Sequence, residues 1–246
     1  MATKQIGIFT KDSRLFFKLL ETLKNFQFKF VILDYAEKIP KNISAILCSN
    51  SDIINFDTII YCDLNDVEKC IRTATSYMFE KDTFLNIVIG IDPGPNPGLV
   101  VVGDGLVLEE KIVPENILDV VKKIYSDYKF LNFKIKIGSG DVINRNHIIN
   151  QLIEDFVVEI VDEKNTSAAK RNDIDSAKKI AFLEGFLVYE KQPISYKNGG
   201  IVEIQRKSRV LSNGKITISR LLAKKVLSGK ISIKQAIEIQ ENSNKK

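Results

Sequence analysis

The sequence has no tryptophan, one histidine, two methionines and three cysteines among its 246 residues. The cysteines, Cys48, Cys62 and Cys70, are an odd number without metal-ligand spacing, which argues against a disulfide framework. His147 is the single histidine, so the sequence also argues against a Cys/His zinc site. We therefore predict a reduced, cytoplasmic protein whose chemistry depends on other side chains.

Long apolar runs are also missing. No run reaches the roughly 18 to 20 residues that a membrane span needs, and the first residues lack the apolar core of a signal peptide. We predict no membrane partner. Apolar residues make up 44% of the chain and charged residues 27%, which excludes a wholly disordered or collagen-like chain. The length allows one large or two small domains.

Positive charge is concentrated at the C-terminus. Residues 197–246 hold 12 Lys and Arg against 3 Glu, whereas the whole chain carries a net charge of +5. The remaining residues are therefore mildly acidic. A basic tail on an acidic body indicates an anionic partner, although a solvated basic surface would give the same composition.

The periodicity of apolar residues predicts a small parallel α/β unit over residues 1–82. Asp12 or Ser13 is a candidate cap for its first helix, and Asn65 or Asp66 for a helix that runs to Phe79. The turn after the first strand lacks the glycines of a dinucleotide-binding loop. We expect a docking or structural role for this unit. Its strands are predicted at 4–9, 28–33, 44–48 and 58–61.

Residues 83–192 are predicted to follow the order β-β-β-α-β-α-β-α. The first strand, 86–92, ends in an acid and is followed by a Pro-Gly turn, 93–98. Gly103-Asp104-Gly105 is typical of a hairpin turn, and Pro114 suits the start of a helix. Later strands are predicted at 133–137 and 157–161, and later helices at 144–155 and 172–189.

Residues 193–246 form a basic C-terminal segment. Alternating apolar and polar residues predict a strand over 201–211, followed by the turn Asn213-Gly214. Two short helices are then predicted, 219–228 and 233–240. They fit a helix-turn-helix reader of nucleic acid or a helical hairpin packed on the body, and the pattern leaves both interpretations open.

Several acids fall at the ends of predicted elements of the central unit. Asp92 follows its first strand, Asp141 the fourth, and Asp162 and Glu163 the fifth, while Asp173 and Asp175 open the last helix. Ligands bind beyond the carboxyl ends of strands in open α/β sheets. If these ends converge, oxygen ligands without His or Cys favour Mg²⁺ or Mn²⁺ over zinc.

Each acid also has a structural interpretation. Asp92 could cap its turn, and Asp141 or Asp173 could cap a helix. Asp175 could pair with Lys179 one helical turn later. Asp173 and Asp175 are two residues apart, so they cannot point the same way from a helix.

Three segments carry a family resemblance. Ile91-Asp92-Pro93-Gly94 resembles the opening of the RuvC Holliday-junction resolvases and their YqgF relatives. The segment 161–167, Val-Asp-Glu-Lys-Asn-Thr-Ser, is similar to the Asp-Glu-Arg-Leu-Thr/Ser segment of YqgF. Asp175-Ser176-Ala177 is similar to the terminal acidic pattern of both families. The match spans about residues 86–190.

The resemblance implies an RNase H-like mixed sheet in the central unit. It implies that Asp92 and Asp175 bind metal and that Glu163 lies in the site, with Asp141 or Asp173 as a further ligand. RuvC-like resolvases act as dimers on DNA junctions, so a homodimer is one implied assembly. Asn172 and the Gly138-Ser139-Gly140 turn depart from the family patterns.

We therefore expect a Mg²⁺- or Mn²⁺-dependent nuclease acting on a DNA junction or RNA. Basic residues from two segments are the expected phosphate contacts: Lys164, Lys170, Arg171, Arg206, Lys207 and Arg209. One alternative is a non-catalytic nucleic-acid-binding protein that keeps the fold, which the departures favour. Another is an actin-like phosphotransferase, although that class needs two copies of the Asp-containing motif and this chain has one.

Overall fold

A computed structural model of the chain describes most of its residues. The described residues are 4–34, 38–114, 116–162, 172–194, 198–228 and 230–244. None of the helices among them is long and apolar enough to cross a membrane. The chain divides into two compact units, one made of Met1–Ile89, Val100–Lys111 and Asp119–Lys134, the other of Gly90–Leu99, Ile112–Leu118 and Ile135–Lys246.

A four-stranded parallel sheet with the order β2-β1-β3-β4 opens the chain. The side chain of Asp12 caps α1 by accepting hydrogen bonds from Arg14 and Leu15, one of the two predicted caps. Apolar residues at helical spacing bury one side of α1 and α2 in the core of this unit. The elements are β1 (Gln5–Ile8), α1 (Ser13–Leu23), β2 (Phe30–Ile32), β3 (Ile43–Cys48), β4 (Ile59–Tyr61) and α2 (Val67–Phe79).

A second, six-stranded sheet has the order β10-β9-β8-β5-β6-β7. β8 and β9 are parallel, whereas β9 and β10 are antiparallel. The chain is therefore an α/β protein with a mixed sheet, as predicted at this level. The elements are β5 (Phe84–Asp92), β6 (Gly98–Gly103), β7 (Leu106–Ile112), α3 (Ile117–Asp127), β8 (Phe130–Gly138), α4 (Val142–Leu152), β9 (Val158–Val161), α5 (Asp173–Phe182) and β10 (Gly185–Val188).

The last helix of this region is shorter than predicted. We expected a helix over 172–189, but α5 ends at Phe182 and β10 follows it. The Lys136 ammonium group donates hydrogen bonds to the carbonyl oxygens of Ala181 (3.2 Å) and Leu183 (2.5 Å). These bonds satisfy carbonyl groups left without partners where the helix stops. The aromatic and branched residues that follow pair as a strand with β9 instead.

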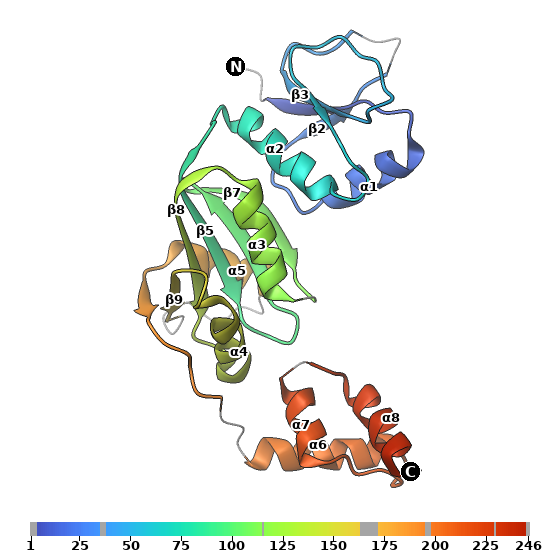
Figure 1. Cartoon of the computed structure of the whole chain (residues 1–246), viewed down its shortest axis with the longest axis vertical. Helices are drawn as coiled ribbons and strands as arrows, with labels where there is room; N and C mark the ends of the chain where they lie inside the picture. Colours follow the sequence, from blue (N-terminus) through green and yellow to red (C-terminus); the bar gives the residue numbers. More distant parts are fainter. Residues whose placement is uncertain are drawn as a thin grey trace. The chain divides into compact units, whose positions relative to one another are not determined.

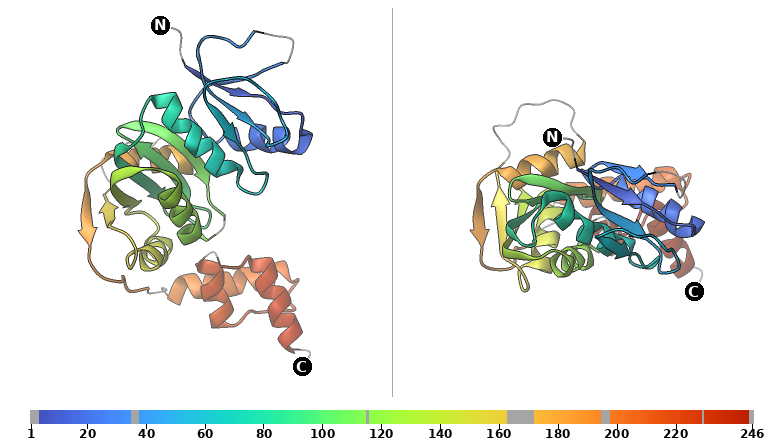
Figure 2. Two further views of the ribbon diagram at one scale, coloured as in Figure 1. Left: turned by 45° about the horizontal axis from the view of Figure 1, so that its top comes forward. Right: turned by 90° about the horizontal axis from the view of Figure 1, so that it is seen from above.

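Three helices form the C-terminal bundle: α6 (Asn198–Leu211), α7 (Arg220–Leu227) and α8 (Ile233–Asn244) (Figure 1, Figure 2). The predicted strand over 201–211 is wrong, because this segment is α6. Ile201, Ile204 and Ser208 recur at three- and four-residue spacing and turn toward the core of the bundle. Polar residues lie between these positions, and the resulting alternation of apolar and polar residues is why a strand was predicted.

A buried arginine links α2 to β7 and α3 within the first unit. The Arg72 side chain is completely buried and forms two hydrogen bonds of 2.9 Å with Glu109 of β7. It also bonds Asp127 at 2.8 Å and Glu68 at 3.0 Å. Burial alone would lower the pKa of Arg72, but Glu109 and Glu68 raise it above its ordinary value. The guanidinium therefore stays charged and is hydrogen-bonded to three carboxylates.

The chain beside this cluster also covers the edge of the second sheet. Phe26 forms an antiparallel bridge with Glu109. The Gln27 N–H donates to the Leu108 carbonyl (3.2 Å), and the Glu110 N–H donates to the Asn25 carbonyl (2.7 Å). These bonds occupy backbone groups of an edge strand that would otherwise be open to pairing with another chain.

Removing the Arg72 charge should destabilise the protein. Arg72→Met leaves the carboxylates of Glu109 and Asp127 buried without their partner, which typically costs about 3–5 kcal/mol. We expect a loss of that size in the free energy of unfolding, measured by urea denaturation. Lys69→Met removes an exposed cation from the same helix and should change stability by less than about 0.5 kcal/mol. Equal stability of the two variants would contradict this role.

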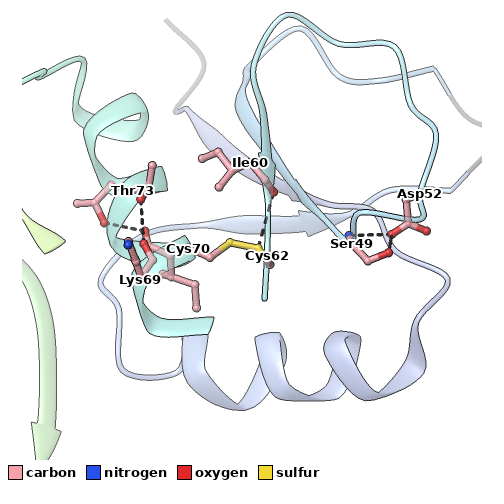
Figure 3. The surroundings of a disulfide bond; sticks show 9 residues. Ser49, Asp52, Ile60, Cys62, Lys69, Cys70 and Thr73 are labelled. Carbon is pink, nitrogen blue, oxygen red and sulfur yellow. Dashed lines mark hydrogen bonds between the residues drawn. A yellow bond between two sulfur atoms is a disulfide. The ribbon is translucent and has the colours of Figure 1, made fainter. Parts of the chain in front are cut away.

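Two of the three cysteines form a disulfide, contrary to our expectation that all would be unpaired. Cys62, after β4, is joined to Cys70 of α2, with 5.4 Å between their Cα atoms (Figure 3). Both lie in the hydrophobic core of the first sheet, where a pairing of this separation is geometrically ordinary. Cys48 is a free, buried cysteine, and burial raises the pKa of its thiol to about 11.

Thiol counting tests the disulfide directly. Protein purified without reductant and denatured in guanidinium should show one thiol per chain, from Cys48, because Cys62 and Cys70 are oxidised. After reduction the count should rise to three. Cys48→Ala should lower both counts by one. Three thiols before reduction would show that the pair is not oxidised in the isolated protein.

Candidate functional site

Asp92 ends the central strand of the second sheet. Side chains alternate between the faces of a strand, and Ile87, Ile89 and Ile91 are fully buried on one face of β5. Gly90 and Asp92 therefore lie on the other face, which α5 covers. The predicted position of Asp92 at the carboxyl end of a strand agrees with its place as the last residue of β5.

Two glycines let α5 approach the sheet at backbone distance. A Cβ atom at Gly90 would overlap the carbonyl oxygen of Ala177 and lie 2.8 Å from the Ala181 Cβ. A Cβ atom at Gly98 would overlap the carbonyl group of Asp173 and lie 3.1 Å from its Cβ. Because Asp92 and Gly98 flank the same turn, the first turn of α5 lies at the Asp92 end of the sheet.

The phase of α5 decides which of its two acids faces the sheet. Ala177, Ile180 and Ala181 are its buried residues. Asp173 is four residues before Ala177, a rotation of about 40°, so it lies on the same side of the helix as these residues. Both acids are exposed, but Asp175 is about 200° from Asp173 and therefore lies on the opposite side of α5. The structure therefore places Asp173, rather than Asp175, toward the Asp92 end of the sheet.

Asp141 caps α4. Its carboxylate accepts hydrogen bonds from the Asn144 backbone N–H (3.2 Å) and the Asn144 side-chain amide (2.8 Å). A carboxylate at a helix N-terminus is also favoured by the helix dipole. This is the structural alternative that its sequence position allowed, and its oxygens are engaged within α4.

The remaining predicted site residues divide into two groups. Glu163, Lys164, Lys170 and Arg171 lie outside the described residues. Arg206, Lys207 and Arg209 are exposed on α6, and Lys207 pairs with Glu203 at 2.9 Å. Within the described ranges, no group of three or more His, Cys, Asp or Glu residues is arranged to hold a metal ion.

A groove beside the Pro-Gly turn includes the single histidine. Gly94 and Pro95 of the turn and Asn144 and His147 of α4 are among the residues that line it. Burial lowers the pKa of His147 below its ordinary value, so the imidazole is neutral at pH 7. His147 lies on α4, within the helix predicted over 144–155, and its side chain is half-buried.

Sequence analysis missed two asparagines that fix the chain before the bundle. The side-chain amide of Asn146 donates to the Pro193 carbonyl (2.8 Å), and Asn150 both donates to the Gln192 carbonyl (2.8 Å) and accepts from its N–H (2.6 Å). Their spacing of four residues on α4 was the available signal. The segment that follows β10 is therefore bound along α4.

At the carboxyl edge of the first sheet, the Asp52 carboxylate is engaged by hydrogen bonds from within the same sheet unit. The Asp52 carboxylate accepts hydrogen bonds from the Lys11 N–H (2.9 Å), the Ser49 N–H (2.8 Å) and the Ser49 hydroxyl (2.6 Å); Figure 3 shows the Ser49 contacts. Burial acts to raise the pKa of Asp52, but the hydrogen bonds lower it below its ordinary value. These hydrogen bonds engage the Asp52 carboxylate at the edge where ligands of α/β sheets usually bind.

Two parts of the chain match family models. Residues 5–78 match a response regulator receiver-like domain, and residues 198–242 match a three helical bundle domain. No curated protein matches the chain. Among solved structures, the Argonaute of Marinitoga piezophila in complex with 5′ OH guide RNA is similar at 15% identity, with a TM-score of 0.22. That match covers 95% of this chain, which spans about half (54%) of the Argonaute chain.

The contact between α5 and the sheet gives a sharp test. Gly90→Ala forces the backbone of α5 away from β5, and overpacking of this kind typically costs about 1–3 kcal/mol. We expect that loss in the free energy of unfolding. Gly94→Ala is the matched control, because a Cβ atom there meets nothing within 4 Å. If Gly90→Ala is as stable as Gly94→Ala, the close approach does not exist in solution.

Proposed function

We propose that the protein is a divalent-metal-dependent nuclease that hydrolyses phosphodiesters in structured DNA or RNA. The sheet supports an RNase H-like arrangement, because its first strand, β5, is central, with β6 and β7 on one side and β8 and β9 on the other. One observation carries the proposal: α5 brings its first acidic turn to the strand end that carries Asp92.

The residues at this place fit a hard cation. Asp92 and Asp173 supply carboxylate oxygens from a strand and from a helix. Glu163, the further ligand expected beside them, is also a carboxylate. Such a set favours Mg²⁺ or Mn²⁺. Carboxylates held at one end of a sheet repel each other unless a cation compensates them. When bound, the cation would polarise a phosphodiester and activate water.

The protein's own residues would divide the work. Asp92 and Asp173 would hold the cation, with Glu163 after β9 as the expected third oxygen ligand. The rigid contact between α5 and β5 would fix the separation of the first two carboxylates. Asp141 would keep α4 in place, and Asp175 would lie outside the site. The expected homodimer and cytoplasmic location stay predictions.

Cleavage assays test the proposal. Wild-type protein should cut labelled four-way DNA junctions or structured RNA in Mg²⁺ or Mn²⁺, and EDTA should abolish cutting. Asp92→Asn and Asp173→Asn should each lower the rate by more than about 100-fold. Mutating a residue that only hydrogen-bonds to a metal ligand already costs about 10- to 100-fold, and these two residues would bind the metal directly. Asp175→Asn is the matched control and should keep most activity.

A non-catalytic nucleic-acid-binding protein is the second candidate. It is favoured by the capping role of Asp141, whose oxygens are engaged within α4, and by the departures from the family patterns at Asn172 and Gly138-Ser139-Gly140. It predicts binding to the same substrates without cleavage in either metal. Equal rates for wild type and Asp92→Asn would likewise contradict the nuclease.

A further inference from the structure

The cations of the C-terminal bundle are unevenly distributed. Residues 198–228, which contain α6 and α7, hold seven Lys and Arg against one Glu. Residues 230–244, which contain α8, hold two Lys and two Glu and carry no net charge. The basic character noticed in the sequence therefore belongs to the first two helices among the described residues of the bundle.

These cations lie on the surface. The bundle has its own apolar core, formed by Ile201, Ile216, Ile218, Leu222, Ala223 and Ala236. Arg206 and Arg209 are three residues apart on the exposed side of α6, and Arg220 and Lys224 are four apart on the exposed side of α7. Residues at these spacings are neighbours on a helix surface. Each helix therefore presents a pair of cations to solvent.

The third helix does not suit base recognition. In a helix-turn-helix protein, the helix after the turn enters the major groove. Here that helix is α8, whose exposed side includes Lys234, Glu238 and Glu241. Its net charge of −1 would oppose insertion between two rows of phosphates. The helix-turn-helix interpretation that the sequence left open is therefore disfavoured.

Two other modes of binding lack their usual residues. Proteins that bind single strands stack bases on aromatic side chains, and residues 198–244 contain no Phe, Tyr or Trp. Amphipathic helices that lie in a membrane surface usually carry aromatic or large apolar anchors on one continuous face. On α6 and α7, by contrast, cations such as Arg206, Arg209 and Lys224 lie among the exposed large apolar residues, which are Val202, Val210, Leu211 and Leu221.

We propose that the exposed cations of α6 and α7 bind the phosphate backbone of double-stranded nucleic acid without sequence preference. The inference rests on the proposed function for the class of partner and adds the surface that holds it. A duplex suits this surface because its two phosphate rows give it a high charge density. α8 then serves to complete the bundle's core through Ala236.

Salt-dependent fluorescence anisotropy tests the surface in the full chain. The probe is a labelled DNA duplex of about 20 bp, titrated in EDTA between about 50 and 200 mM salt. Arg206→Ala/Arg209→Ala should reduce the slope of log K against log salt by about 2, because each phosphate contact contributes about 0.9. It should weaken binding to two unrelated duplex sequences equally.

A matched variant removes the same number of positive charges from residues outside α6 and α7. Lys230→Ala/Lys234→Ala should change the slope by less than about 0.5. Equal effects of the two double variants, or binding to anionic phospholipid vesicles but not to the duplex, would overturn the inference. Because EDTA prevents metal-dependent cleavage, absent nuclease activity with an Arg206/Arg209-dependent slope refutes only the proposed catalysis. Metal-dependent cleavage with an unchanged slope refutes only the surface.

Discussion

The candidate site depends on two glycines, which have no side chain to keep α5 away from the sheet. Gly90 and Gly98 allow the backbone of α5 to touch β5 and β6, and any larger residue would push the helix outward. This contact sets the height of the helix above the sheet and the position of its first turn relative to Asp92. The two carboxylates are held by a strand and a helix rather than by loops, a rigidity that the proposed cation site would need.

The same sequence places its charges in two different physical states. Arg72 is surrounded by carboxylates and buried, so its charge stabilises the link between α2 and β7 and contributes little to attraction of an anion. Arg206 and Arg209 are exposed, so their charge acts on whatever approaches α6. Net charge alone cannot separate these states, because it counts a compensated arginine and a solvated one equally.

The sequence correctly predicted those features of the fold that depend on residues close together in the chain. The apolar run at 86–92 located β5, and Asp12 was correctly proposed as a cap, because both signals lie within a few residues. The segment 201–211 was misassigned because its apolar residues fit both periods, and packing against α7 and α8 decided for the helix. The family resemblance favoured Asp175 over Asp173, whereas the phase of α5 places Asp173 on the side toward the sheet. The pairing of Arg72 with Glu109, 37 residues away, could not be predicted, because no pattern in the neighbouring sequence indicates it.

The amides of Asn146 and Asn150 limit how far the bundle can move from α4. They hold the chain as far as Pro193, and α6 begins at Asn198, so the intervening chain can span at most about 18 Å. A bundle bound to a duplex would therefore keep the Asp92 region near the same molecule. Short connections of this kind typically give effective concentrations in the millimolar range. Weak contacts between the second sheet and the duplex would then suffice for cleavage. The bundle would supply the affinity, and the Asp92 end of the sheet would supply the chemistry.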